Sequence, residues 1–190
     1  MADERVQDER EPADHLDPET RARREAALKL VRKYGDPVLR SRALEIDRFD
    51  DALREEIRRM GRLMHESLGI GLAATQVGVM HRLLVYRVES EGAIAALVNP
   101  VLEWAGEETE PMEEGCLSLP GVLVEVDRAV HVRVRAQDER GEDILVEATG
   151  LEARVIQHEM DHLGGVLILD HASREARKEA IRILRERLGL

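Results

Sequence analysis

The sequence predicts an α+β protein in which antiparallel sheets and amphipathic helices occupy separate stretches of the chain. Short segments rich in Val, Leu and Ile, divided by turn residues, fill residues 80–148. A strongly periodic helical segment precedes them, and two more helical segments follow. Strands that succeed one another without intervening helices are expected to pair in antiparallel sheets.

The length and composition predict one domain with its own core. The chain has 190 residues, of which 43% are hydrophobic. We expect residues 1–16 to form a mobile charged tail and residues 17–190 to form a single domain. The one cysteine excludes an internal disulfide and fits a reducing compartment.

The location and the general class of partner also follow from composition. No apolar run approaches the ~20 residues of a membrane span, and no signal-peptide pattern stands near the N-terminus. We therefore expect a cytoplasmic protein that does not engage a membrane. A net charge of −11 argues against general nucleic-acid binding, which relies on a basic surface.

Two helices are expected in the first third of the chain. Asp17-Pro18-Glu19 predicts the start of a short helix running toward Ala27, with Asp as the cap and Pro at the first helical position. Gly35-Asp36-Pro37 predicts a turn. The clearest helix covers residues 49–67 and ends before Gly69, because apolar and small residues recur there at helical spacing: Leu53, Ile57, Met60, Met64 and Ser67.

Five strands are expected in the middle of the chain. Turn signals such as Asn99-Pro100 and Arg140-Gly141 separate them. The predicted strands are residues 81–88, 93–99, 122–126, 130–136 and 144–148.

The next helix carries the most informative motif, His158-Glu159-Met160-Asp161-His162. Thr149 and Glu152 have the spacing of a capping box, and Gly164-Gly165 marks the end of the helix. Histidines at i and i+4 project from one face, so two imidazoles can bind one metal ion while Glu159 acts on its water as a general base. The alternative is a chance HExxH on a solvated helix. Leu151 and Val155 share the histidine stripe, which favours a buried site.

Two loops supply further candidate residues. Residues 69–76 (GIGLAATQ) are small enough for a ligand to approach, and Gln76 offers an amide donor; a tight glycine-rich connector is the alternative. Cys116 lies in a second loop, residues 113–120, bounded by Gly and Pro. A lone cysteine is often a small buried hydrophobe, but a loop position is typical of a ligand.

With these motifs in order, the chain resembles the peptide deformylases. The three signatures are GIGLAATQ at 69–76, EGCLS at 114–118 and HEMDH at 158–162, and the similarity runs from about Tyr34 through Leu169. The resemblance implies a central helix bearing HExDH, surrounded by antiparallel sheets. It implies removal of the formyl group from N-formylmethionine at the start of nascent peptides, with release of formate.

The resemblance also implies roles for individual residues. Cys116, His158 and His162 would bind the metal, Glu159 would be the catalytic acid and base, and the Gln76 amide and Leu117 backbone N–H would form the oxyanion hole. The peptide would add as a strand at Ile70, Gly71 and Gly115. The methionine pocket would involve Ile70, Met112, Leu151, Arg154, Val155 and the His158 ring. Arg154 departs from the apolar residue expected there, so its stem would line the pocket or its charge would make the rim polar.

The metal and the partners are expectations of the same kind. Thiolate plus two imidazoles suits Zn(II), Fe(II), Co(II) or Ni(II), and the resemblance favours Fe(II) in the cell. We expect a monomer that acts on N-formylmethionyl nascent peptides. A helix over residues 173–188 has a basic stripe of Arg174, Lys178, Arg182 and Arg185 opposite a packing stripe of Arg177, Ile181, Leu184 and Leu188. The resemblance implies ribosome docking through this helix, and a merely solvated charged face is the alternative.

Two other classes of protein share parts of this pattern. A metallopeptidase has HExxH, but its third ligand is usually a downstream His or Glu, whereas Cys116 lies upstream. A structural zinc module needs a fourth protein ligand, and the chain has no second cysteine to supply it.

Overall fold

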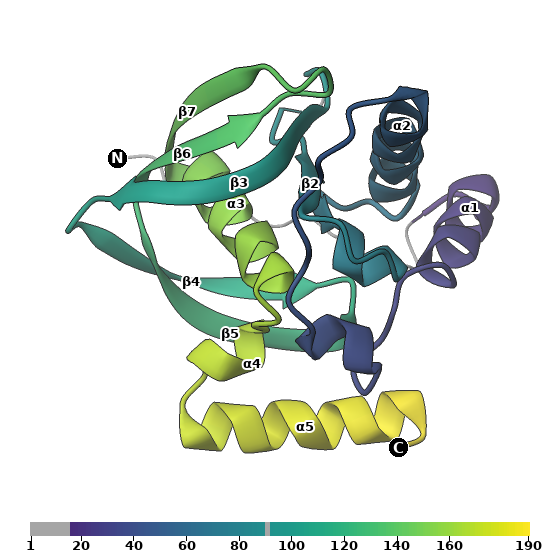
Figure 1. The fold of residues 1–190 in the computed structure, drawn as a ribbon. Coiled ribbons are helices and arrows are strands. Elements are labelled where there is room, and N and C mark those ends of the chain that lie inside the picture. Colours follow the sequence, from purple (N-terminus) through teal and green to yellow (C-terminus); the bar gives the residue numbers. More distant parts are fainter. Residues whose placement is uncertain (1–15, 90–91) are drawn as a thin grey trace.

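The computed structural model describes residues 16–89 and 92–190. The helix with the HExDH motif, α3 (Gly150–Leu163), lies in the middle of the molecule, with the larger sheet on one side and a two-stranded sheet on the other (Figure 1). Residues 1–15 of the predicted tail lie outside the described residues. Within the described part of the chain, no helix is long and apolar enough to cross a membrane.

The larger sheet has five strands in the order β1-β2-β3-β6-β7, and every neighbouring pair is antiparallel. The second sheet is the antiparallel pair β4-β5. The predicted fold class is therefore confirmed. The strands are β1 (Gly71–Ala73), β2 (Leu83–Tyr86), β3 (Ala95–Ala105), β4 (Thr109–Cys116), β5 (Leu119–Ala129), β6 (His131–Gln137) and β7 (Asp143–Thr149).

Two of these strands were absent from the sequence prediction. β1 has only three residues and lies in the glycine-rich loop, too short to show alternation. β4 reads TEPMEEGC, an acidic sequence without an apolar pattern, and pairs with β5 from Thr109 to Gly115. Its partner β5 supplies the alternating apolar residues, so tertiary pairing and not local propensity makes β4 a strand.

The three longer helices outside the site confirm their predictions. In α1 (Pro18–Leu28) the Asp17 side chain accepts hydrogen bonds from the N–H groups of Glu19 and Thr20. α2 (Asp51–Glu66) is capped by Asp50, and α5 (Arg174–Leu188) is capped by Ser173. Three four-residue helices were not predicted: η2 (Pro37–Arg40), η3 (Ala74–Val77) and α4 (Ile168–His171).

Strand β2 explains how the core is arranged. All four of its residues are buried, because both faces of the sheet are covered there. Leu83 and Val85 pack with α1 and α2, while Leu84 and Tyr86 pack with the apolar side of α3. A third cluster joins β5 to α4 and α5. The HExDH helix is thus enclosed between packed layers, which hold its polar residues in fixed positions.

Candidate metal centre

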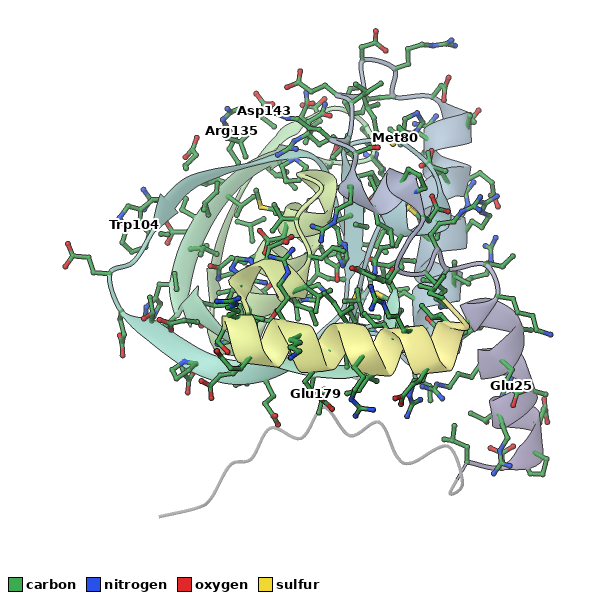
Figure 2. All side chains as sticks on the ribbon, turned by 90° about the horizontal axis from the view of Figure 1, so that it is seen from below. Glu25, Met80, Trp104, Arg135, Asp143 and Glu179 are labelled. Atoms are coloured by element: carbon green, nitrogen blue, oxygen red, sulfur yellow. The ribbon has the colours of Figure 1, made fainter. Side chains whose placement is uncertain are left out.

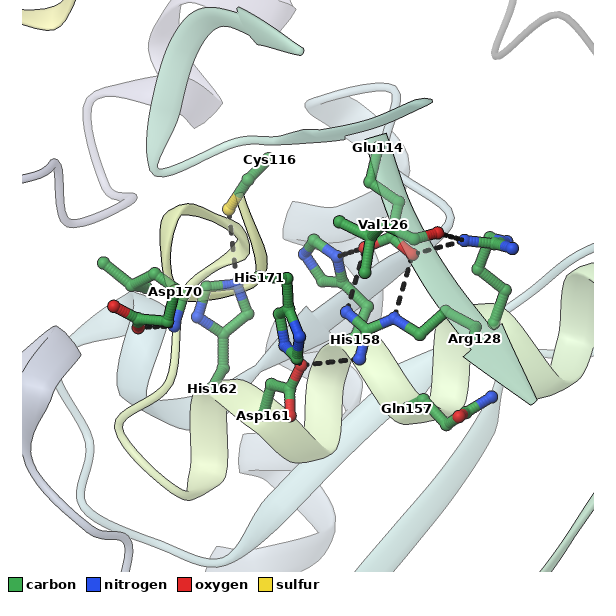
Figure 3. Close-up of polar contacts among 12 residues, drawn as sticks. Glu114, Cys116, Val126, Arg128, Gln157, His158, Asp161, His162, Asp170 and His171 are labelled. Carbon is green, nitrogen blue, oxygen red and sulfur yellow. Dashed lines mark hydrogen bonds and ion pairs between the residues drawn. The ribbon is translucent and has the colours of Figure 1, made fainter. Parts of the chain in front are cut away.

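The structure brings together the three predicted metal ligands. His158 and His162 project from the C-terminal half of α3, with ring centroids 5.0 Å apart. Cys116 is the last residue of β4, and its Sγ lies 3.2 Å from Nε2 of His162 (Figure 3). One ligand atom from each of the three residues lies within 4.8 Å of the other two. That separation, with thiolate and imidazole donors, fits a single transition-metal ion with an open fourth position.

A tight turn between β4 and β5 places Cys116. Gly115 pairs with Leu123, but Cys116 pairs with Leu119, so the register shifts at the cysteine. Ser118 closes the turn, and its N–H donates to Sγ of Cys116 at 3.4 Å. Cys116 is only 3% exposed, so the sulfur faces the two histidines and not solvent.

The charges of this group favour the ligating form of the cysteine. Burial raises the pKa of the Cys116 thiol, but the His162 charge and the hydrogen bond from His158 oppose it. The net effect holds that pKa well below its ordinary value. A thiolate is the form that a metal ion binds, so the protein prepares this ligand through its neighbours.

His158 is oriented by Glu114, a residue that the sequence analysis did not single out. Nδ1 of His158 lies 2.9 Å from Oε2 of Glu114, which leaves Nε2 for a metal. Burial raises the pKa of the Glu114 carboxyl, but hydrogen bonds from His158 and Arg128 and the Arg128 charge lower it to about 2. Glu114 is therefore an anion at neutral pH.

A buried ion-pair network surrounds Glu114. Arg128 donates two hydrogen bonds to it at 3.0 Å and a third to Asp161 at 2.6 Å. Arg154 donates to Glu114 at 2.8 Å, and also to the carbonyls of Val126 and Glu110. Arg154 is 6% exposed, so its guanidinium is buried and forms its bonds inside this network. The pairing depends on β4 and β5 meeting α3, and no local pattern in the sequence indicates it.

Glu159 lies beside the ligands without joining them. Burial raises the pKa of this carboxyl, and the charges of His158 and His162 partly oppose the rise. Among the described residues its buried Oε2 has no hydrogen-bond partner. Gly71 permits this placement, because a Cβ at position 71 would lie 2.4 Å from Oε1 of Glu159. The free oxygen is available to a water or a substrate.

Gln76 and Leu117 lie next to Cys116. Oε1 of Gln76 accepts a hydrogen bond from the Ala73 N–H at 2.9 Å, so its amide nitrogen must face the other way. That nitrogen lies 3.6 Å from Sγ of Cys116 and 3.3 Å from Oγ of Ser118. Leu117, 8% exposed, follows the cysteine directly.

The other predicted site residues lie around this centre. Ile70, directly before β1, is 38% exposed, and its carbonyl accepts a hydrogen bond from the Arg87 N–H. β1 and β4 are edge strands of their sheets. Met112 and Gly115 lie half-buried on β4, and Leu151 and Val155 lie on α3.

The start of α3 differs from its prediction in one detail. The bounds agree, since Thr149 is the N-cap and Gly164 ends the helix. Thr149 makes no side-chain cap, however, so the predicted capping box is not formed. Glu152 instead accepts a hydrogen bond from the Tyr86 hydroxyl at 2.9 Å, which ties α3 to β2.

An HExxH helix whose histidines meet a thiolate, beside a buried carboxylate, defines the site of a metal-dependent hydrolase. The family described as polypeptide deformylase matches residues 28–178. The chain belongs to this family. It is accordingly a hydrolase that removes the formyl group from the N-terminal formylmethionine of nascent polypeptides.

Individual relatives agree along most of their length. The peptide deformylase of Thermotoga neapolitana is 50% identical over 140 residues, 74% of this chain and 84% of that protein. The one from Acidothermus cellulolyticus is 43% identical over 160 residues, 84% and 87% of the two chains. The Synechococcus elongatus enzyme in complex with actinonin superimposes with a TM-score of 0.78 at 42% identity, covering 80% and 85% of the two chains.

Proposed function

We propose that Cys116, His158 and His162 hold one divalent metal ion per chain. The ion would be Fe(II) in the cell, with Zn(II), Ni(II) or Co(II) able to occupy the site in purified protein. The donor set and its spacing support this assignment. When bound, such an ion polarises the formyl oxygen and lowers the pKa of a coordinated water.

Glu159 is the proton carrier in this proposal. Its Oε2, which has no hydrogen-bond partner in the described part of the chain, accepts the proton of the attacking water and then delivers it to the nitrogen that leaves with the peptide. Burial keeps the pKa of this carboxyl above its ordinary value, so the group is a stronger base than a solvated glutamate. Gln76 Nε2 and the Leu117 N–H donate to the formyl oxygen as negative charge develops on it.

The substrate would bind as an extended strand between the two sheets. β1 and β4 each present an edge; Gly71 and Gly115 lie on these strands, and Ile70 directly precedes β1. Main-chain pairing suits many sequences, as a general nascent-chain enzyme requires. The methionine pocket would be formed by Ile70, Met112, Leu151, Val155 and the stem of Arg154, whose charged end binds Glu114.

The experiment is a deformylation assay with metal analysis on protein purified without oxygen. Release of a free amine from formyl-Met-Ala-Ser, and no cleavage of unformylated Met-Ala-Ser, is the expected result. Peptide-bond cleavage in either substrate would favour a metallopeptidase.

Cys116→Ser tests the ligand set, because a hydroxyl is a poorer ligand than thiolate. Metal content and turnover should fall together; if both persist, the proposed coordination is wrong.

We also propose that α5 docks on the ribosome through its basic residues. Arg174, Lys178 and Arg185 are exposed, while Arg182 is paired with Glu179 and Glu186. Arg177, expected on the packing side, is exposed and lies 3.5 Å from Asp170. Ala180 and Leu184 are buried, so removing α5 would also expose the core. Charge reversal is therefore a cleaner test than truncation.

The docking variant reverses Arg174, Lys178 and Arg185 to Glu, and the control reverses the exposed α2 residues Arg58, Arg59 and Arg62. Ribosome co-sedimentation at low salt should be lost in the first and kept in the second. Equal co-sedimentation of both would leave α5 as a solvated charged face.

We further propose a cytoplasmic monomer in which residues 17–190 form one catalytic domain, supported by the match over residues 28–178 and by a lone, unbridged cysteine.

A further inference from the structure

The segment between α1 and η2 contacts both loops that carry the proposed oxyanion donors. The Arg32 N–H donates to the carbonyl of Gln76 at 2.7 Å. The Tyr34 N–H donates to the carbonyl of Ser118 at 2.9 Å. These two backbone bonds join residues 32–34 to the first and the second signature at once, although neither signature includes this segment.

Between them, the Lys33 side chain makes a third bond to the same loops. Its Nζ donates to the carbonyl of Leu117 at 2.9 Å. A hydrogen bond from an ionised donor is shorter and stronger than a neutral one. The side chain is half-buried; burial lowers the pKa of Lys33, while the negative charge of Cys116 raises it. The cation thus lies close to the cysteine and directly on the residue that follows it.

This contact bears on the Leu117 N–H. The peptide group that carries it is fixed on one side by Cys116, whose sulfur faces the histidines. On the other side the chain is held through the Leu117 carbonyl by Lys33, and one residue further through the Ser118 carbonyl by Tyr34. Without the bond from Lys33 to the Leu117 carbonyl, the backbone of the turn between β4 and β5 is free to rotate. The Leu117 N–H would then no longer point toward the formyl oxygen.

We propose that Lys33 is a positioning residue for deformylation, which fixes the backbone of Leu117 from its carbonyl side so that the Leu117 N–H meets the developing oxyanion. The proposal rests on the oxyanion roles given above to Leu117 and Gln76. Lys33 acts through the Leu117 carbonyl and not through the reacting atoms. Its effect is felt in the transition state, where the formyl oxygen gains charge, and not in the binding of the peptide.

The test compares Lys33→Met with Lys33→Arg and with Lys29→Met. Methionine keeps the apolar stem and removes the donor, whereas arginine restores a cationic donor. Lys29 is an exposed lysine at the end of α1 and serves as the matched control. Each protein is loaded with the same metal and assayed with formyl-Met-Ala-Ser.

Loss of one direct oxyanion donor typically costs ~10²- to 10³-fold in kcat. An indirect displacement should cost less, so we expect kcat of Lys33→Met to fall about tenfold with KM unchanged. Lys33→Arg should recover most of the loss, and Lys29→Met should match the wild type. Metal content and the thermal midpoint of Lys33→Met should stay near the wild-type values.

Three results would overturn the proposal. The first is an unchanged kcat in Lys33→Met. The second is a loss that accompanies lower metal content or a lower thermal midpoint, or that arginine does not restore, since either would make Lys33 a structural anchor. The third is an unchanged kcat in Gln76→Leu, because that result would contradict the oxyanion hole on which the role of Lys33 rests. Loss in Gln76→Leu with full activity in Lys33→Met would remove only the role of Lys33.

Discussion

Helices α3 and α5 are almost equal in length but place their charged residues in opposite surroundings. α3 has 14 residues, and seven are buried, among them Arg154, Glu159 and His162. α5 has 15 residues, and only Ala180 and Leu184 are buried. Figure 2 looks onto α5 and shows charged side chains along it, Glu179 among them. Both helices carry ion pairs, but the enclosed ones, such as Arg154 with Glu114, belong to α3.

The comparison shows that burial decides what an ion pair does. Breaking a buried pair leaves a charge without water or partner, and this typically costs about 3–5 kcal/mol. The two charges of an exposed pair are solvated by water whether or not they are paired, so the pair contributes little to the free energy of unfolding. Substitutions in the buried polar groups of α3 should therefore alter folding, metal binding or catalysis, whereas substitutions of the exposed charges of α5 should alter only what binds to its surface.

The largest effect is expected at Glu159. Glu159→Gln keeps the shape of the side chain but cannot accept a proton, and general acid–base catalysis typically contributes ~10²- to 10⁴-fold. Because this carboxylate serves both proton transfers, kcat should fall toward the upper end of that range while metal content stays near one per chain. Glu152→Gln, on the same helix, is the control and should stay active. Loss of metal would make Glu159 a ligand or a folding residue, and wild-type turnover would require another base.

The next effect is expected at Glu114, in the network behind His158. Glu114→Gln leaves Arg154 buried without an anion and Arg128 with Asp161 alone, so unfolding in urea should require about 3–5 kcal/mol less free energy. Metal affinity should also fall about 10- to 100-fold, because His158 loses the carboxylate that orients it. Glu113→Gln is the matched control: Glu113 is exposed and lies opposite Glu125 on β5. Equal stability of the two variants would contradict the role of burial.

The pH dependence of stability sharpens the same comparison. The folded protein lowers the pKa of Glu114 from 4.5 to about 2, so its contribution is present above pH 4.5 and is lost as the pH falls toward 2. The shift corresponds to about 3 kcal/mol. The difference in unfolding free energy between wild type and Glu114→Gln should therefore shrink across this window. A difference that is constant from neutral pH to pH 2 would show that the carboxylate charge is not its source.

The smallest effect is expected on α5. Arg182 forms ion pairs with Glu179 and Glu186, but all three side chains are more than half exposed. Arg182→Ala should leave the urea midpoint, metal content and kcat unchanged within error. A loss of stability comparable to that of Glu114→Gln would mean that exposure is a poor guide to ion-pair energy in this chain.

The helices and most strands were predictable because their signals are local. Asp17, Asp50 and Ser173 each precede a helix that they cap, and β6 alternates buried and exposed residues along its length. β4 was missed because its residues are acidic and its pairing with β5 is the only cause of its conformation. β1 was missed because three residues show no period.

The candidate site divides in the same way. Three motifs made Cys116, His158 and His162 candidates before their distances were known. The ion pairs of Glu114 with Arg128 and Arg154 join residues 14 and 40 positions apart, and the bond from Lys33 to Leu117 spans 84. Such contacts exist only once the sheets and α3 have packed. For this reason Arg154 was expected at the pocket, although its guanidinium lies in the network.

The shortness of β1 affects the tendency of the enzyme to aggregate with other proteins. An unpaired strand edge is a template on which foreign chains can assemble, and long flat edges are a cause of aggregation. The edge that β1 offers is three residues long. A passing chain can form only a few main-chain bonds there, too few to nucleate a growing sheet. This end of the larger sheet is thus too short to seed a fibril.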